Sequence, residues 1–477
     1  MTRALAVCIL AASCSNSIVL APAVSSSGTA VYLAVSELGE IREAWVVDLA
    51  SGSGDECRPM IDDPNERVLA VRFDARPDDL CLAPGCLEVE PGGEPLGEGA
   101  EVFELVHHNV SPRWVPLSSD HSELGALRVP PCDRAPSPVA ELTLGGLHTC
   151  ARLEDGRVFC WGAGQTGQLG DHVDWTSSPR LVSLDGAARD LASGARHTCA
   201  LVSEALWCWG DDALGQIGAT DRDAHFLPVR GLDPGLGVDA VAAGWAHTCV
   251  QLADGRVTCW GSNEASQLGG APGQGSTVFP PGVEGAAQLS LGKIHSLALM
   301  PDGRLMGWGG NPYGQLVDGT TESRAEPRAA PFEAPIEAIS AGEQHTCVLA
   351  GGSVYCGGYN NHGQSSATPG SIFTLSPMRG GERASLVVAG GRMTCWVEAG
   401  VPSCVGEAFA EHEAIERLED VGLVSIGQTE MQNGEIVHAC AVSSGRTIWC
   451  WGPNGHGQLG DGTNESRSAP VKVVWPR

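Results

Sequence analysis

The chain has 477 residues, which is long for one ordinary hydrophobic core and suits several domains or one domain built from repeats. Its 63 glycines and 30 prolines favour many short strands joined by turns over a helical fold. With 57 acidic and 29 basic residues the net charge is −28. Such a surface repels phosphate backbones, so nucleic acid is not expected as a partner.

The first 14 residues resemble a bacterial lipoprotein signal. Arg3 supplies a positive charge, residues 4–12 are apolar, and small residues precede Cys14, the cysteine that would be lipidated. Leu10 stands one place earlier than such signals prefer, so a secretory signal cut near residues 21–23 and an unprocessed cytosolic N-terminus stay open. We expect export to the cell envelope. Lipid on Cys14 would be the sole membrane attachment, because no later segment has the roughly 18 apolar residues of a membrane helix.

Residues 15–137 contain no repeat, and they are predicted to form a small acidic β-rich domain of sandwich type. The segments TAVYLAVSEL, REAWVVDLAS and RVLAVRFDA alternate or run apolar between turn residues, as strands do. Four cysteines here predict two disulfides whose connectivity is open: Cys57, Cys81, Cys86 and Cys132.

Residues 138–477 read as seven copies of one unit. Each copy has a histidine at the same place, except that Arg392 stands there in the sixth; the histidines are His148, His197, His247, His295, His345 and His438. The resulting period of about 48 residues is the length of four short strands with their turns. The sequence therefore predicts an all-β fold, a seven-bladed β-propeller preceded by the small β-rich domain.

Six of the copies also carry a pair of cysteines nine or ten residues apart. The pairs are Cys150 and Cys160, Cys199 and Cys208, Cys249 and Cys259, Cys347 and Cys356, Cys395 and Cys404, and Cys440 and Cys450. The spacing of ten encloses a three-residue turn and the spacing of nine a two-residue turn, so both cysteines stay opposite each other across a hairpin. The fourth copy has Leu297 and Gly307 instead, so both cysteines are lost together. We predict a cross-strand disulfide in each of the six copies.

Other interpretations of these residues explain less. The cysteines could be small apolar core residues. A zinc site would need four convergent ligands, and each repeat offers only two cysteines and a histidine. A residue repeated in every copy belongs to the scaffold, since an enzyme needs one site. We therefore expect no catalytic residue, no metal and no cofactor, with the histidines acting as structural hydrogen-bonding groups.

A second signature follows the hairpins of the copies other than the sixth: Trp161-Gly162 leads to Gly167-Gln168-Leu169-Gly170, and the seventh copy repeats this order at residues 451–460. The order of glycine, two variable residues, histidine, turn glycine, Trp-Gly and Gly-Gln-Leu-Gly resembles the regulator of chromosome condensation family over residues 139–477. The resemblance implies a seven-bladed ring. The sixth copy lacks both Trp-Gly and Gly-Gln-Leu-Gly, which puts its outer half in doubt.

The resemblance implies more than one activity. Eukaryotic members catalyse nucleotide exchange on a small GTPase and bind chromatin, roles that export and the charge of −28 disfavour. Secreted bacterial propellers with this repeat inhibit β-lactamases. We expect a binding scaffold in the periplasm or on the cell surface, a monomer that holds a protein or glycan on one propeller face. A secreted inhibitor, a structural envelope protein, and a polysaccharide hydrolase or lyase with a carboxylate pair at the channel stay as alternatives.

The variable residues between the glycine and the histidine are the expected ligand face, since a ring of equivalent positions can carry specificity. The candidates are Leu147, Arg196, Trp245, Lys293, Glu343 and Gln344, together with Tyr313. Trp175, Phe226 and Phe279 in loops between blades are weaker candidates. The identity of the ligand stays open, as does the blade to which the final strand near residues 470–475 pairs.

Overall fold

A computed structural model describes residues 137–219, 221–231, 237–273, 277–366, 370–407, 415, 417–428 and 437–475, and the backbone of seven strands between residues 29 and 128. The chain divides into two compact units, Met1–Cys132 with Trp475–Arg477, and Asp133–Val474. Every regular element in these ranges is a β-strand. No helix that is long and apolar enough to cross a membrane is found among them.

The first unit contains a five-stranded antiparallel sheet with the order β2-β1-β3-β5-β6, and β4 pairs with β7. The strands are β1 (Thr29–Val35), β2 (Ile41–Asp48), β3 (Arg67–Phe73), β4 (Glu88–Val89), β5 (Glu101–Val106), β6 (Arg113–Pro116) and β7 (Leu127–Arg128). The first three coincide with the predicted strand segments. The sandwich packing stays a prediction, and Cys14, Cys57, Cys81, Cys86 and Cys132 lie outside the described residues.

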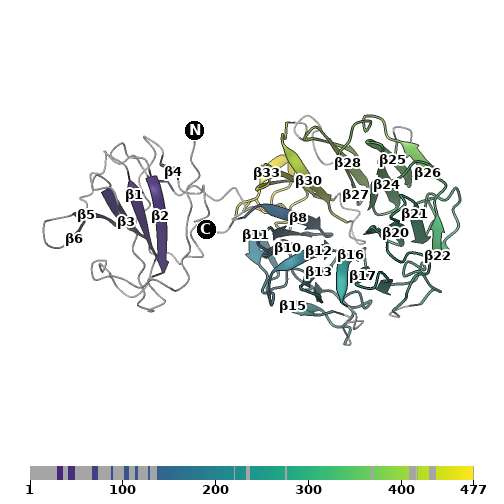
Figure 1. Cartoon of the computed structure of the whole chain (residues 1–477), viewed down its shortest axis with the longest axis horizontal. Helices are drawn as coiled ribbons and strands as arrows, with labels where there is room; N and C mark the ends of the chain where they lie inside the picture. Colours follow the sequence, from purple (N-terminus) through teal and green to yellow (C-terminus); the bar gives the residue numbers. More distant parts are fainter. Residues whose placement is uncertain are drawn as a thin grey trace. The chain divides into compact units, whose positions relative to one another are not determined.

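The second unit is a ring of seven antiparallel sheets, so the predicted seven-bladed propeller is confirmed (Figure 1). Blades 1 to 3 comprise β8 (Val139–Leu144), β9 (His148–Leu153), β10 (Val158–Ala163) and β11 (Trp175–Leu181); β12 (Ala188–Ser193), β13 (His197–Val202), β14 (Ala205–Gly210) and β15 (His225–Arg230); and β16 (Val238–Ala243), β17 (His247–Leu252) and β18 (Val257–Gly261).

Blades 4 to 7 follow in chain order. They comprise β19 (Gln288–Leu291), β20 (His295–Leu299), β21 (Leu305–Gly309) and β22 (Arg324–Ala329); β23 (Ala338–Ala341), β24 (His345–Ala350), β25 (Ser353–Gly358) and β26 (Ile372–Pro377); β27 (Leu386–Gly390), β28 (Met393–Glu398) and β29 (Val401–Gly406); and β30 (Val421–Ile426), β31 (Ala439–Ser443), β32 (Thr447–Gly452) and β33 (Arg467–Lys472). Within their described residues, blades 3 and 6 each have three strands, and the other five blades have four.

The central hairpin of each blade has the turn that its sequence demands. Gly351 and Gly352 form the two-residue turn between β24 and β25, with φ angles of 58° and 72° as a type I′ turn requires. In the three-residue turn of blade 1, Gly156 takes a φ of 83°. Both turns place the cysteines directly opposite each other, as in the pairs Cys347↔Cys356 and Cys150↔Cys160.

Among the described strands, none is exchanged between blades where the ring closes. The first strand of each blade contacts the first strand of the next, and β30 contacts β8, so these strands form the inner wall. The last strand, β33, pairs with β32 of its own blade. Backbone hydrogen bonds join the ends of the ring, from Val139 N to Gly445 O at 2.7 Å and from Gln428 N to Gly145 O at 3.1 Å.

The hydrophobic core lies between successive blades. In one cluster the disulfide Cys150–Cys160 and Leu169 of blade 1 pack against Leu191 and Trp209 of blade 2. The structure has all six predicted disulfides, each with a Cα–Cα distance of 4.1 Å, which is close to that of an antiparallel pair that lacks mutual hydrogen bonds. Disulfides persist in oxidising compartments, so six of them indicate such an environment.

Candidate functional site

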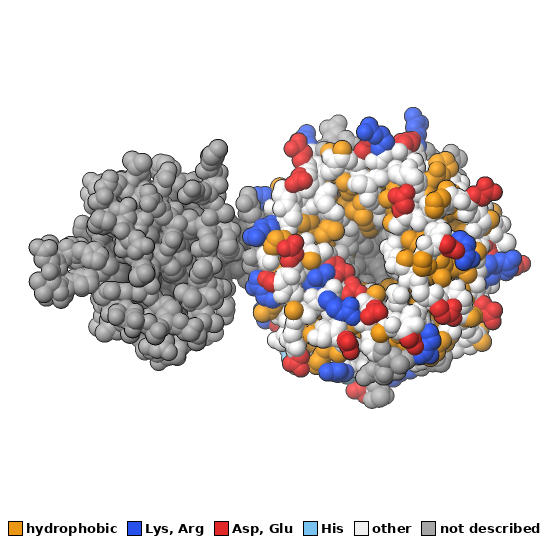
Figure 2. Space-filling view, viewed as in Figure 1, with side chains coloured by type: hydrophobic (Ala, Val, Ile, Leu, Met, Phe, Trp, Pro, Cys, Tyr) orange, Lys and Arg blue, Asp and Glu red, His pale blue; other side chains and the backbone are white. Residues whose placement is uncertain are grey.

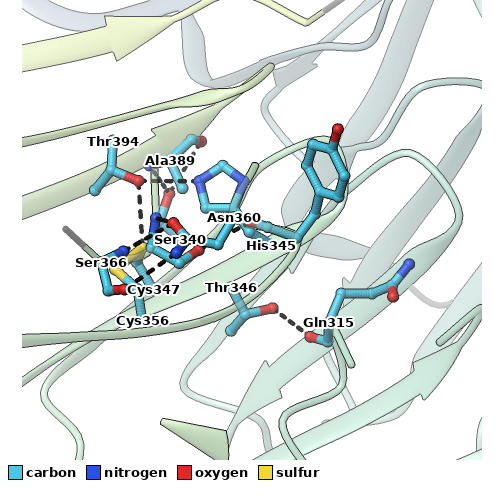
Figure 3. The surroundings of a disulfide bond; sticks show 12 residues. Gln315, Ser340, His345, Thr346, Cys347, Cys356, Asn360, Ser366, Ala389 and Thr394 are labelled. Carbon is cyan, nitrogen blue, oxygen red and sulfur yellow. Dashed lines mark hydrogen bonds between the residues drawn. A yellow bond between two sulfur atoms is a disulfide. The ribbon is translucent and has the colours of Figure 1, made fainter. Parts of the chain in front are cut away.

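The repeated histidines join each blade to the next. His148 Nε2 lies 2.9 Å from Thr198 Oγ1 in blade 2, and His345 Nε2 lies 2.9 Å from Thr394 Oγ1 in blade 6. Figure 3 shows the second of these contacts beside the disulfide Cys347–Cys356. Six histidines make this contact, and that of His438 with Thr149 closes the ring at 2.8 Å. The histidines are therefore scaffold residues.

The Gly-Gln-Leu-Gly signature supplies further hydrogen bonds to this contact between neighbouring blades, which we call the blade joint. The Thr248 hydroxyl donates to the carbonyl oxygen of Gln216 at 2.7 Å, and Trp260 Nε1 donates to the same oxygen at 3.2 Å. Since the hydroxyl proton is used in this bond, His197 Nε2 is the donor to Thr248. Blades 1 to 4 and blade 7 thus each present one histidine and one glutamine carbonyl to the following blade.

These histidines are uncharged. Burial lowers the pKa of His148, His197, His247, His295 and His438 to about 3 and that of His345 to about 4. A glycine three residues before each of the first five histidines is needed for the same packing. A Cβ atom on Gly194 would lie 2.2 Å from His197 Cε1 and 2.4 Å from the Gly244 oxygen.

One joint of the ring lacks these partners. Between blades 6 and 7, Met393 stands in place of the histidine and Ala439 in place of the threonine. Met393 pairs with Gly406 as His148 pairs with Gly162, so the prediction that Arg392 holds the histidine position was wrong by one residue. Trp451 Nε1, whose counterparts bond a glutamine carbonyl, is buried without a hydrogen-bond partner. The histidine contact, its hydroxyl partner and the tryptophan bond are therefore all absent at this joint, while Arg392 occupies the variable position that Leu147 holds in blade 1.

The loops that carry the variable residues form a second ring at one end of the inner strands. Ala195 N donates to Trp245 O at 3.2 Å, Lys293 N donates to Glu343 O at 3.2 Å, and Glu343 N donates to Gly391 O at 2.9 Å. Each of these bonds crosses from one blade to the next. The backbone of the expected ligand face is thus held by the ring itself, and its side chains vary on a fixed frame.

Several of these side chains meet in one group, which we call the loop cluster: Trp245, Lys293, Glu343, Arg392, Glu407, His362, Tyr359 and Tyr313. Lys293 lies over the Trp245 ring and pairs with Glu343. Arg392 pairs with two carboxylates: its Nε lies 3.4 Å from Glu343 Oε2, and its Nη1 lies 3.1 Å from Glu407 Oε2. The Glu343 side chain is 6% exposed and that of Arg392 is 31% exposed, so charge is only partly solvated here.

Aromatic residues extend the loop cluster toward blade 4. His362 Nδ1 lies 3.7 Å from Glu407 Oε2, and its ring lies 5.8 Å from that of Tyr359. Tyr359 in turn meets Tyr313 edge to face at 5.0 Å. Figure 2 shows one face of the propeller, hollowed at its centre, where basic and acidic side chains are intermixed rather than segregated.

The structure brings four of the seven expected ligand-face residues into the loop cluster: Trp245, Lys293, Glu343 and Tyr313. Leu147, Arg196 and Gln344 are half-buried in other parts of the loop ring. Arg392 and Glu407 were not among the expected ligand-face residues. Arg392 occupies the same variable position as Leu147, so aligning the sixth copy on Met393 would have included it. Of the weaker candidates, Trp175 and Phe279 are exposed, and Phe226 stacks on His172.

A pair of carboxyl groups lies on adjacent inner strands, where the sequence gave no sign of one. Glu141 on β8 hydrogen-bonds Asp190 on β12, and Arg152 Nε donates to Glu141 Oε2 at 3.0 Å. Burial, and then the charge of Asp190, raise the pKa of Glu141 to about 7. Asp190 accepts backbone bonds from Leu191 and Val241, so it also has a structural role.

Fold and site together define a seven-bladed β-propeller whose repeated residues serve the blade joints and whose unrepeated residues gather in the loop cluster. The chain belongs to the RCC1-like domain family, whose model matches residues 115–477. It is 27% identical to the ultraviolet-B receptor UVR8 of Arabidopsis thaliana, over 72% of this chain and 71% of the receptor. It is also 27% identical to the bovine secretion-regulating guanine nucleotide exchange factor, over 66% of this chain and 78% of that protein.

Other relatives share only part of their length. The human E3 ubiquitin-protein ligase HERC2 is 30% identical over 46% of this chain, and the match covers 5% of the ligase. Among solved structures, human WBSCR16 has a TM-score of 0.61 at 18% identity, covering 67% of this chain and 95% of that one. Yeast Prp20p has a TM-score of 0.51 at 18% identity, over 70% and 76%. These structures show the fold.

Proposed function

We propose that the protein is a non-enzymatic binding scaffold of the cell envelope, and that it holds a protein or glycan on the propeller face that carries the loop cluster. The observation that supports this most is the convergence of variable residues from blades 3 to 6 into one contiguous group. Trp, Tyr and Arg are the residue types that dominate binding energy at protein interfaces.

The rigidity of the frame supports the same proposal. Backbone hydrogen bonds between blades fix the loops before any ligand arrives, so little conformational entropy is lost on binding. The names of the relatives include a receptor, an exchange factor and a ligase, so membership of the family leaves the activity open. The structure of Prp20p is described together with its binding to Gsp1p and histones, which illustrates protein binding in a related fold.

Placement in the envelope rests on the six disulfides and on the resemblance of residues 1–14 to a lipoprotein signal. A cytosolic nucleotide-exchange role would place these cysteines in a reducing compartment. Lipid on Cys14 is part of the proposal, and intact-mass measurement of the mature protein checks it.

Retention on immobilised full-length protein tests the binding role. Periplasmic extract and a glycan array are applied to the wild-type chain and to Trp245→Ala, with Trp175→Ala as the matched control on the outer strand β11. We expect one ligand to be retained, with at least tenfold weaker retention by Trp245→Ala and unchanged retention by the control. Equal retention by all three chains contradicts the proposed face.

A polysaccharide hydrolase is the second candidate, and the Glu141–Asp190 pair favours it. A carboxyl group with a pKa of about 7 can act as a general acid at neutral pH. Asp190 uses both oxygens to accept backbone bonds, which weighs against a nucleophilic or basic role. Release of reducing sugar by the wild-type chain and its loss in Glu141→Gln would favour the enzyme over the scaffold.

A further inference from the structure

A buried asparagine braces the loop after the third strand in several blades. Asn454 Oδ1 accepts a hydrogen bond from Leu459 N at 2.9 Å, and Asn454 Nδ2 donates to Asp461 Oδ1 and Thr463 O, each at 3.1 Å. Asn311 makes the equivalent bonds in blade 4. Asn263 and Asn360 also accept a backbone bond through Oδ1 and donate through Nδ2 to the far part of the loop.

Blade 2 has an aspartate at this position. Asp212 is fully buried, and its Oδ1 accepts bonds from Ile217 N at 2.7 Å and Gly218 N at 3.3 Å, as the asparagines do. Its Oδ2 therefore takes the place of the donating Nδ2 and faces the same loop. This oxygen has no hydrogen-bond partner. A carboxylate cannot donate, so the donor bond that the asparagine makes in blades 3, 4, 5 and 7 is missing here unless a cation takes its place.

Other residues of this loop in blade 2 also differ from those of blade 7, and they too replace a structural partner by a group that can bind a metal ion. Alignment of the repeats puts Asp221 where blade 7 has Thr463, His225 where it has Arg467, and Ala219 where it has Asp461. The basic partner and its carboxylate have thus given way to a histidine and a second carboxylate. Asp221 Oδ1 lies 3.0 Å from His225 Nε2, and one ligand atom from each of Asp212, Asp221 and His225 lies within 4.8 Å of the others.

We propose that these three side chains bind a divalent metal ion, with Zn²⁺ as the expected ion. Two carboxylate oxygens and an imidazole nitrogen are a zinc donor set, and the half-exposed Asp221 leaves the fourth position open to water. The imidazole disfavours Ca²⁺ and Mg²⁺, which prefer oxygen ligands. The ion would replace the missing amide donor and tie β14 to β15 through their connecting loop.

Other charges lie near the site. Arg222 is beside Gly215, and its positive charge acts on Asp212 as that of His225 does. Asp223 donates its backbone N–H to Asp221. The Arg222 guanidinium competes with a metal ion for the Asp212 carboxylate, and a zinc titration shows which of the two this carboxylate binds. The expectation of no metal rested on the repeated histidines and cysteines, none of which belongs to this site.

Zinc titration of the EDTA-treated full-length chain tests the proposal, with a chromophoric chelator as competitor. We expect the wild-type chain to bind one more equivalent of Zn²⁺ than Asp212→Asn or His225→Ala, with affinity reduced at least 100-fold in both variants. Asp212→Asn installs the residue that four other blades use, so it should fold without metal. His456→Ala, which alters the corresponding loop of blade 7, is the matched control and should bind as wild type.

Two further readouts separate a specific site from loss of folding. Zn²⁺ should raise the Tm of the wild-type chain and leave that of Asp212→Asn unchanged, and Co²⁺ should give visible d–d bands that Asp212→Asn lacks. Equal zinc stoichiometry and affinity in the wild-type chain and Asp212→Asn would overturn the site, and so would a wild-type chain that binds no zinc. Neither result bears on the loop cluster, which lies in other blades.

Discussion

At the scale of single residues, one glycine and one histidine determine how closely two blades approach. The imidazole of His197 fills the space where a side chain at position 194 would begin. The same ring then reaches Thr248 of the next blade at 2.9 Å. Any atom added at the glycine therefore displaces a hydrogen bond between blades as well as a packed ring.

The first prediction concerns this glycine. Gly194→Ala should lower the free energy of unfolding by about 3 kcal/mol or more, because overpacking and a lost buried bond add together. Gly422→Ala is the control: Gly422 also lies on an inner strand, and a Cβ there meets no atom within 4 Å. Denaturant unfolding of both variants measures the difference. Similar destabilisation of the two would contradict the steric argument.

The second prediction concerns Glu141. Because its pKa is raised from 4.5 to about 7, the folded chain retains a proton that the unfolded chain releases between these values. This group therefore lowers stability as pH rises through that range. Glu141→Gln keeps an acceptor for Arg152 and adds a donor toward Asp190, so it should be more stable than wild type at pH 8 by about 1 kcal/mol or more. Thermal unfolding at pH 5 should show little difference; an equal gain at both values would refute the assignment.

At the scale of elements, the hairpin of each blade is the unit that sequence alone predicts well. Spacing of nine or ten residues and the glycine of the turn are local, and they fix which residues face each other. The contacts of the histidines could not be derived this way, because they depend on the placement of one blade against the next. The Glu141–Asp190 pair and the contacts that join Trp245, Lys293, Glu343 and Tyr313 to the rest of the loop cluster were not predicted for the same physical reason, since these residues are far apart in the chain.

Blade 4 gives the third prediction. Leu297 and Gly307 are opposite each other where the other hairpins carry cysteines, and the Cβ of a residue at 307 would meet Leu297 Cδ2 at 3.5 Å. The double variant Leu297→Cys, Gly307→Cys should form a seventh disulfide of the same kind. Thiol titration of the denatured chain should give the wild-type count for the double variant and one additional thiol for Leu297→Cys alone. Two additional thiols in the double variant would show that the register is wrong.

At the scale of the whole molecule, the buried histidines make the ring sensitive to acid. All six are neutral when folded, with pKa values of about 3 to 4, and they regain an ordinary pKa near 6.5 on unfolding. Below pH 6.5 the unfolded chain therefore binds protons that the folded chain does not. Stability falls as pH falls, by up to about 1.4 kcal/mol per histidine for each pH unit.

The fourth prediction follows from this loss of stability at lower pH. Denaturant unfolding should show a large loss of stability between pH 7 and pH 5, above the range in which ordinary carboxylates titrate. Glu141 opposes the trend, but one such group cannot offset six histidines. Glu141→Gln should accordingly show a steeper loss than wild type. Stability that is flat or rises from pH 7 to pH 5 would be incompatible with neutral histidines in the joints.

The closure of the ring by whole blades bears on how such a chain can change in evolution. Each copy in the sequence forms one sheet of its own, because β33 pairs within its own blade and no strand that the structure describes is shared with a neighbouring blade. Duplication or loss of one copy of the gene segment would thus add or remove a finished structural unit. The joint between blades 6 and 7, which lacks the shared histidine and threonine, is the place where such an insertion would break the fewest established contacts.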